Sequence, residues 1–262
     1  MSARPVPGPT DSPGVQRYLI ESSPRRVRVV FAGEVVADST GVRLLFETGK
    51  LPVYYFPKDD VGVDAFSASG RMEADQVKGP TQFFDLDVGG RAADHAAWRC
   101  AGNLEYGPDI GDLIAFDWNK MDAWFEEDEE VFVHARDPYH RVDVVESSRR
   151  VEIRIDATAV ADSHRPMMLF ETGLPTRYYL PKTDVHLKLL ERSESHTGCP
   201  YKGTADYFSV RTGKRLVEDI AWCYEAPIPE MPKITGRLCF YDERVDVVID
   251  GRLQERPRTK WS

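Results

Sequence analysis

One short segment of the sequence combines a thiol with two groups that could activate it. Cys199 precedes Pro200, and a residue before proline is held extended, so the thiol would point in a defined direction. Lys202 or His196 could lower the pKa of this thiol and make it a nucleophile. The segment therefore predicts Cys199 and Lys202 as catalytic residues. The alternative is a buried structural thiol, because free cysteines are among the most buried residues.

A second set of residues has the composition of a ligand pocket, which is mostly apolar with a few polar groups. Its aromatic members could wall a planar or cationic ligand, and its charged members would supply polarity. The predicted ligand-binding residues are Glu171, Arg177, Tyr178, Tyr179, Tyr201, Trp222 and Tyr224. Two alternatives stay open: the aromatic residues form the core, and Glu171-Thr172 bonds to the backbone in a turn, as Glu47-Thr48 would.

The acidic, histidine and cysteine residues lack the spacing of a metal site. Glu126 to Glu130 are contiguous, and contiguous carboxylates rarely converge on one ion, so this run predicts a solvated turn. His134, His140 and His164 are isolated in the sequence, and no Cys-x-x-Cys pair occurs. We expect no metal, no cofactor and reduced thiols.

The chain repeats itself at an offset of 124 residues. Ala37-Asp38-Ser39 recurs as Ala161-Asp162-Ser163, and Leu45 to Gly49 recurs as Leu169 to Gly173. Further matches at the same offset are Tyr54-Tyr55 with Tyr178-Tyr179, Lys78-Gly79 with Lys202-Gly203, Ala97-Trp98 with Ala221-Trp222, and Phe116 with Phe240. A constant register over this length indicates two copies of one domain.

The differences between the copies place the candidate site in the second. His196 to Tyr201 have no counterpart in residues 72–77, where only the following Lys-Gly is shared. Arg177 is replaced by Val53, and Trp222-Cys223-Tyr224 becomes Trp98-Arg99-Cys100. The first copy therefore reads as a repeat with a degenerate site.

The hydrophobic pattern predicts β-strands. Apolar residues alternate with charged ones at residues 27–31 and 151–155, the period of a half-buried strand. The same alternation at Val185, Leu187 and Leu189 predicts another strand, and Arg244 to Ile249 predicts one that stops at the turn dipeptide Asp250-Gly251. The frequent prolines break the chain into short strands. We expect an all-β or β-dominated protein built from two tandem copies of a small antiparallel domain.

The expected organisation has three parts. Residues 1–15, rich in Pro, Ser and Gly, predict a loose tail. Residues 16–140 form the first repeat, and residues 141–262 form the second.

Composition narrows the classes of partner. The net charge of −9 argues against a nucleic-acid partner, which would require clustered Lys and Arg. The sequence has no signal-peptide pattern at its start and no apolar run of membrane-spanning length, so we expect a cytoplasmic protein without a membrane partner. The two repeats could pack as a pseudo-dimer within a monomer or a weak homo-oligomer.

With these motifs in view, the chain resembles the bacterial domain-of-unknown-function family numbered 427. The resemblance covers nearly the whole chain twice and is most specific at Leu169 to Pro181, Cys199 to Gly203 and Trp222 to Tyr224. It is compatible with a tent-like arrangement of short antiparallel strands. The family is sometimes labelled nucleotidyltransferase-like, which implies a Gly-Ser loop and paired aspartates on Mg²⁺. The sequence has no Gly-Ser dipeptide, and Asp85-Leu86-Asp87 precedes Gly89-Gly90, where a hairpin explains it.

Three functional hypotheses follow. The first is a small-molecule binding protein with its pocket in the second repeat. The second is an enzyme that uses Cys199 with Lys202 or His196, or, more weakly, one that transfers nucleotides. The third is a structural or interaction scaffold, a role that can coexist with ligand binding.

Overall fold

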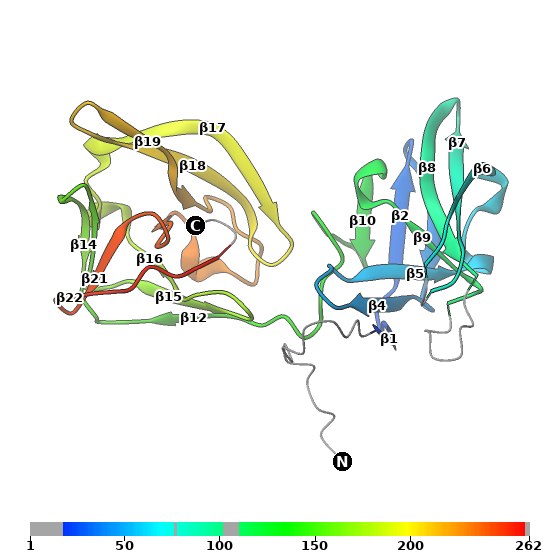
Figure 1. The fold of residues 1–262 in the computed structure, drawn as a ribbon, viewed down its shortest axis with the longest axis horizontal. Helices are drawn as coiled ribbons and strands as arrows, with labels where there is room; N and C mark the ends of the chain where they lie inside the picture. Colours follow the sequence, from blue (N-terminus) through cyan, green and yellow to red (C-terminus); the bar gives the residue numbers. More distant parts are fainter. Residues whose placement is uncertain (1–17, 76–77, 102–109, 260–262) are drawn as a thin grey trace, which may run out of the picture. The chain divides into compact units, whose positions relative to one another are not determined.

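The structure is a computed structural model that describes residues 18–75, 78–101 and 110–259 (Figure 1). The chain divides into two compact units between Asp137 and Pro138, and each unit is considered by itself. The described residues form β-strands and short 3₁₀ turns without an α-helix, so the expected all-β class is confirmed. None of their helical segments is long and apolar enough to cross a membrane. The predicted tail at 1–15 lies outside the described residues.

The first repeat contains two antiparallel sheets. The larger has the strand order β1-β4-β5-β9-β8-β7-β6 and the smaller has the order β11-β10-β2-β3. The strands are β1 (Tyr18–Ser22), β2 (Val27–Phe31), β3 (Glu34–Ser39), β4 (Arg43–Glu47), β5 (Val53–Pro57), β6 (Phe66–Glu73), β7 (Thr81–Val88), β8 (Arg91–Cys100), β9 (Leu113–Phe116), β10 (Ala123–Glu126) and β11 (Glu129–Glu130).

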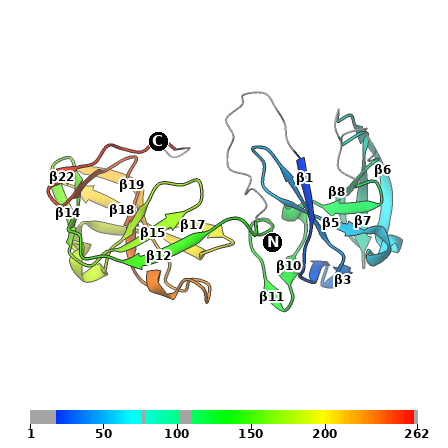
Figure 2. The ribbon, with the colours of Figure 1, turned by 90° about the horizontal axis from the view of Figure 1, so that it is seen from below.

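The second repeat contains three antiparallel sheets, with orders β12-β15-β16, β14-β13-β21-β22 and β17-β18-β19-β20. Strands β12 and β15 lie side by side in both views (Figures 1 and 2). The strands are β12 (Val142–Glu146), β13 (Val151–Ile155), β14 (Thr158–Ser163), β15 (Met167–Glu171), β16 (Arg177–Tyr179), β17 (Leu190–Cys199), β18 (Gly203–Thr212), β19 (Arg215–Cys223), β20 (Leu238–Phe240), β21 (Asp246–Ile249) and β22 (Arg252–Leu253).

The two repeats share one topology. In the first, β5 pairs with β9 through Phe56 and Ile114, which joins the sheet into one piece. In the second, the equivalent residues Leu180 and Leu238 form an isolated bridge, so the same connection persists in shortened form. The internal repeat read from the sequence is therefore a repeat of strand pairing as well.

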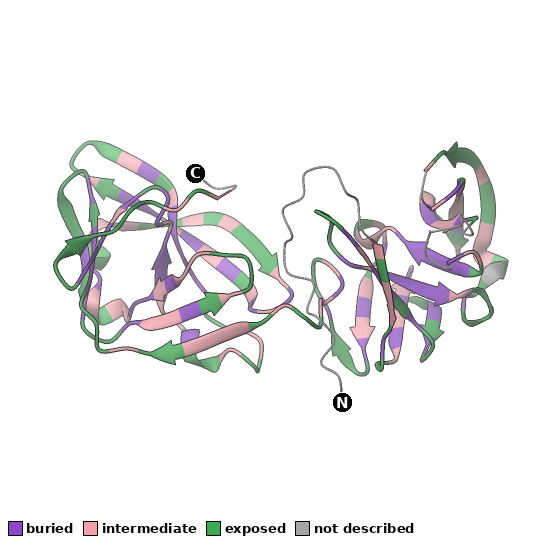
Figure 3. Cartoon of the chain, turned by 60° about the horizontal axis from the view of Figure 1, so that its bottom comes forward, coloured by how far each residue is buried: buried purple, intermediate pink, exposed green. Residues whose placement is uncertain are grey.

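The apolar residues of the predicted alternating strands are buried, as expected. Val27, Val29 and Phe31 on β2 are fully buried, and the equivalent Val151, Ile153 and Ile155 on β13 are at most 5% exposed. Figure 3 shows short stretches of buried residues interrupted by intermediate and exposed ones along many strands. Each repeat holds its own apolar core, because strands with one apolar face must bury it against a second sheet.

The predicted strand at Val185 to Leu189 is wrong. Val185 pairs with Ala161 at a single bridge, and the chain then forms a 3₁₀ turn at Leu187–Leu189. The Leu189 amide donates to the His186 carbonyl at 2.9 Å, and Leu187 is 49% exposed. Three alternating residues fit a strand or one turn of 3₁₀ helix, and here local hydrogen bonding decides.

The acidic run is only partly a solvated turn. Glu127 and Asp128 connect β10 to β11, as expected of a turn. Glu126, in contrast, is buried, because its side chain turns inward to bond with the Tyr54 hydroxyl and the Arg25 guanidinium.

Two predicted hairpin turns are confirmed. Gly89 and Gly90 link β7 to β8 with φ values of 59° and 86°. Asp250 and Gly251 link β21 to β22 with φ values of 50° and 80°. Positive φ at both central residues matches the right-handed twist of a hairpin and favours Gly and Asp. The Asp-x-Asp motif thus belongs to a hairpin strand.

Candidate functional site

Strands β15 and β16 divide the predicted site residues between two faces. Leu169 lies opposite Arg177 in the ladder, and side chains alternate along a strand, so Leu169, Glu171, Arg177 and Tyr179 share one face. Tyr178 points to the other face and packs against a different apolar cluster. The predicted residues therefore do not line one common pocket.

Glu171 is the centre of a buried charged cluster. Its carboxylate accepts a hydrogen bond from the Lys202 ammonium and contacts Nε2 of His140 at 2.9 Å. The side chains of Glu171 and Lys202 are 7% and 10% exposed. The His140 ring stacks on Tyr201 with 4.2 Å between ring centroids.

The cluster holds Glu171 in its charged form. Burial alone would raise the pKa of the carboxyl, but the hydrogen bond with His140 and the charge of Lys202 together lower it. This is the behaviour of a carboxylate whose partners replace the lost water. Lys202 is accordingly committed to an ion pair.

The turn that presents Lys202 requires the glycine that follows. Gly203 has φ of +103°, and a Cβ there would lie 3.2 Å from the Ile228 amide nitrogen and 3.3 Å from the Pro227 Cα. Only glycine adopts this conformation so close to another backbone segment. The Lys-Gly dipeptide thus fixes the backbone turn that carries Lys202.

The same ion pair exists in the first repeat. Lys78 Nζ donates to Glu47 at 3.0 Å, and Lys50 and the Tyr18 hydroxyl bond to the same carboxylate. The shared Glu-Lys pair is therefore a feature of the fold. The shared threonine has a separate role in the second repeat, where the Thr172 hydroxyl accepts from the Arg141 amide at 3.0 Å.

The aromatic residues on this face belong to the core. The Trp222 indole donates to the Tyr179 hydroxyl at 3.1 Å, and Tyr224 packs on the same ring with 6.4 Å between centroids. Tyr179 is 1% exposed. The first repeat contains the equivalent bond, from Trp98 to the Tyr55 hydroxyl at 3.2 Å.

A second charged group is peculiar to the second repeat. Arg177 donates through both terminal nitrogens to the Glu243 carboxylate, at 2.8 and 2.7 Å. The Arg177 guanidinium also lies 5.6 Å from the Trp222 ring centroid and 3.9 Å from an oxygen of Asp242. Burial disfavours its charge, but the hydrogen bonds that Arg177 donates to Glu243, together with the nearby negative charges, outweigh burial and raise the pKa of Arg177. The pairing is of the bidentate kind that fixes geometry.

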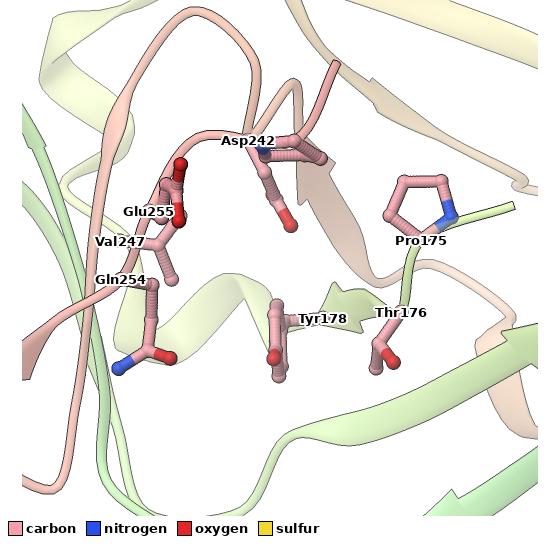
Figure 4. A pocket seen from close by; sticks show the side chains of 8 residues that line it. Pro175, Thr176, Tyr178, Asp242, Val247, Gln254 and Glu255 are labelled. Carbon is pink, nitrogen blue, oxygen red and sulfur yellow. The ribbon is translucent and has the colours of Figure 1, made fainter. Parts of the chain in front are cut away.

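A cavity of about 200 Å³ opens beside this group, between β16 and the segment after β22. We call it the Asp242 cavity. Figure 4 shows the side chains of Asp242, Tyr178, Thr176 and Gln254 extending toward the same space. The rest of the lining consists of Pro175, Val247, Glu255 and Pro257.

Asp242 is the unusual member of this wall. It is 7% exposed, and burial raises the pKa of its carboxyl to about 7, against the opposing effect of Arg177. The folded state binds the Asp242 proton more tightly than the unfolded state does. The resulting contribution to the free energy of unfolding is present below the unfolded pKa and is lost as pH rises through about 7. A titratable carboxyl facing a cavity is a common attribute of binding sites.

The sequence matches the family described as a domain of unknown function, DUF427, over residues 19–127 and again over residues 143–251. The chain belongs to the DUF427 family. Its two matched regions are the two β-repeats, so each repeat is one DUF427 domain. No curated protein matches the chain.

In the second DUF427 domain, Cys199 ends β17, and its predicted partners are engaged elsewhere. Lys202 pairs with Glu171, and His196 pairs with Asp206 at 2.9 Å. The Lys202 amide donates to the Cys199 carbonyl at 3.3 Å, so the segment is a closed turn. The nucleophile hypothesis stays a prediction.

Iodoacetamide should label Cys199 first in the native protein. Cys199 is half-buried, whereas Cys100, Cys223 and Cys239 are at most 1% exposed. Burial also raises the pKa of Cys223 to about 12, and that of Cys239, which suppresses their thiolates. Peptide mass spectrometry after brief labelling at pH 8 measures the order, with Cys199→Ser as the control. Equal labelling of Cys223 would contradict the described packing.

Sequence reasoning missed His140, Asp242 and Glu243. A signal for two of them was present, because Tyr241-Asp242-Glu243 stands where the first repeat has Asp117-Trp118-Asn119. The same comparison of copies that singled out Arg177 would have found its partner. The copies also differ at His140, where the first repeat has Gln16.

Proposed function

We propose that the second DUF427 domain binds a small organic cation, such as a protonated amine or amidine, in the Asp242 cavity. The observation that carries the proposal is the position of the Asp242 carboxyl. It is buried and lines the cavity, while its nearest cation, Arg177, gives both terminal nitrogens to Glu243. The Arg177–Asp242 approach is 3.9 Å, so a cation in the cavity would add a closer partner.

The remaining wall suits the same ligand. The Tyr178 ring offers an aromatic surface, which attracts organic cations. Glu255 adds a second carboxylate, and Thr176 and Gln254 offer polar groups that could orient a ligand. Small-ligand sites commonly combine a shaped surface with a few fixed polar groups.

One neighbouring cation is neutralised by its own partner. Arg149 is close enough to Tyr178 to influence the pKa of its hydroxyl. The Arg149 side chain, however, donates to Asp250 at 2.8 Å. The wall of the cavity therefore keeps an excess of negative charge when Asp242 is ionised.

Titration calorimetry with benzamidine at pH 8 tests the proposal. We expect saturable binding to the wild-type chain and at least a tenfold weaker affinity in Asp242→Asn, because one direct charge contact is worth about 1.4 kcal/mol or more. The Asn variant should fold, since it removes a charge that is costly to bury. Asp143→Asn, on the separate strand β12, removes the same charge and should bind as the wild type does.

The pH dependence of benzamidine affinity tests whether the ligand pairs with the ionised Asp242 carboxylate. Because Asp242 must lose its proton to pair with the ligand, affinity should fall about tenfold for each pH unit below about 7. Benzamide, the neutral analogue, should not bind. Equal benzamidine affinity in wild type and Asp242→Asn, or no binding at pH 8, would refute the proposal.

A further inference from the structure

The first repeat contains a larger cavity, of about 530 Å³, lined by residues of β6 to β9 and of the segment after β5. We call it the Arg99 cavity. Its floor is apolar and comes from Val61, Phe66, Phe84 and Ile114. Val61 and Ile114 are buried, whereas Phe66 and Phe84 are only half-buried and keep part of their rings open. A cavity of this size and lining is within the range of small-ligand sites.

The pairing of the strands explains why Arg99 lies beside the apolar floor. Ala68 pairs with Phe84, Phe84 pairs with Ala97, and Gln82 pairs with Arg99. Because alternate residues of a strand share a face, Arg99 lies on the same side of the sheet as Phe84. The arginine therefore faces the apolar floor at one end of the cavity.

The charge of Arg99 is available to a ligand. Within the described ranges, Arg99 makes no hydrogen bond or ion pair, and its side chain is half-buried. Lys58 also lines the cavity, and its bond to Asp112 at 3.2 Å joins two exposed side chains, which is a weak pairing. Asp59 is the acidic residue of the described lining. The positive charges of Lys58 and Arg99 therefore exceed the negative charge of Asp59 in this lining.

The second repeat has lost this arrangement. At the equivalent positions Cys223 replaces Arg99, and Arg192 replaces Ala68. Lys182, the counterpart of Lys58, bonds to Glu225. The cation at the floor and the small residue that leaves room beside it are therefore specific to the first repeat.

We propose that the Arg99 cavity is a second binding site, which takes a small amphipathic carboxylate with an aliphatic or aromatic body. The body lies on Phe66 and Phe84, and the carboxylate pairs with Arg99. A guanidinium fork matches a carboxylate in two parallel bonds, and burial of the apolar body supplies the remaining affinity. The first repeat is then a binding domain with a different ligand class, in place of the degenerate copy expected from sequence.

Octanoate is a suitable probe, and binding can be followed by calorimetry and by amide chemical shifts of the full chain. We expect saturable binding, with the largest shifts at residues 61–68 and 84–86. Arg99→Gln should weaken octanoate affinity at least tenfold. Ala68→Trp, which fills the cavity without adding a charge, should abolish octanoate binding. Octylamine should not compete, because the cations repel it.

Arg71→Gln is the matched control. Arg71 is also on β6 but lies over the Phe83 ring, on the other face of the sheet, so its removal should leave octanoate affinity unchanged. Octanoate affinity unaffected by both Arg99→Gln and Ala68→Trp would overturn the inference, as would the absence of saturable binding to the wild type. Benzamidine binding to the second repeat is a separate readout, so the two proposals can fail independently.

Discussion

Replacing Arg177 by methionine should lower the free energy of unfolding of the second repeat by about 3 to 5 kcal/mol. The Glu243 carboxylate has 0% of its side chain exposed and receives two bonds from Arg177. Methionine fills a similar volume but leaves Glu243 and Asp242 buried next to each other without a cation. Hydrogen exchange of peptides from 151–163 and 177–180, measured across a urea series, gives the free energy for this repeat.

The loss should depend on pH with a definite sign. Bonding to Arg177 keeps the pKa of Glu243 below its usual range despite the opposing effect of burial, and this contribution is present above the unfolded pKa. In Arg177→Met the deficit should therefore shrink as pH falls and the carboxyls take up protons. Arg215→Met breaks the exposed pair with Asp156 and should change stability little. A similar small effect of Arg177→Met would show that the buried pair does not stabilise the fold.

Lys202→Met should destabilise the second repeat by about 3 kcal/mol, because it leaves the buried Glu171 carboxylate with His140 alone. The first repeat provides an internal comparison. Lys78→Met removes the equivalent ammonium, but Lys50 and Tyr18 still bond to Glu47. We therefore expect a smaller loss from Lys78→Met.

The same hydrogen-exchange measurement, on peptides of β4 and β15, compares these two variants. Glu171→Gln combined with Lys202→Met should recover part of the stability, since both charges are then gone. Equal losses in Lys202→Met and Lys78→Met would contradict the compensation that the extra partners of Glu47 imply.

Sequence patterns were sufficient for the strands whose alternation spans a whole element, such as Val27 to Phe31. They failed at Val185 to Leu189, because three residues cannot distinguish a strand from a 3₁₀ turn when local bonds favour the turn. The internal repeat indicated the tandem organisation directly, since the β2–β3 pairing recurs as the β13–β14 pairing at the same offset of 124 residues.

The site was less accessible from sequence, for a physical reason. Arg177 and Glu243 are 66 residues apart, and only the connection of β16 to β20 brings them together. The type of a residue indicates that its charge needs an oppositely charged partner. The pairing of distant strands decides which residue that partner is. At Glu126 the sequence pattern predicted a solvated side chain, but the carboxylate is buried and accepts a hydrogen bond from the buried Tyr54 hydroxyl.

The shared register also has a consequence for how the protein can be re-engineered. Both repeats keep the Glu-Lys and Tyr-Trp bonds, while some of the residues around each cavity differ at matching positions, such as Arg99 and Cys223. Each residue that lines one cavity therefore has an equivalent position in the other repeat. A few exchanges between matching positions, which lie 124 residues apart up to Phe240 and 123 apart from β21 onward, could therefore give the chain two like sites.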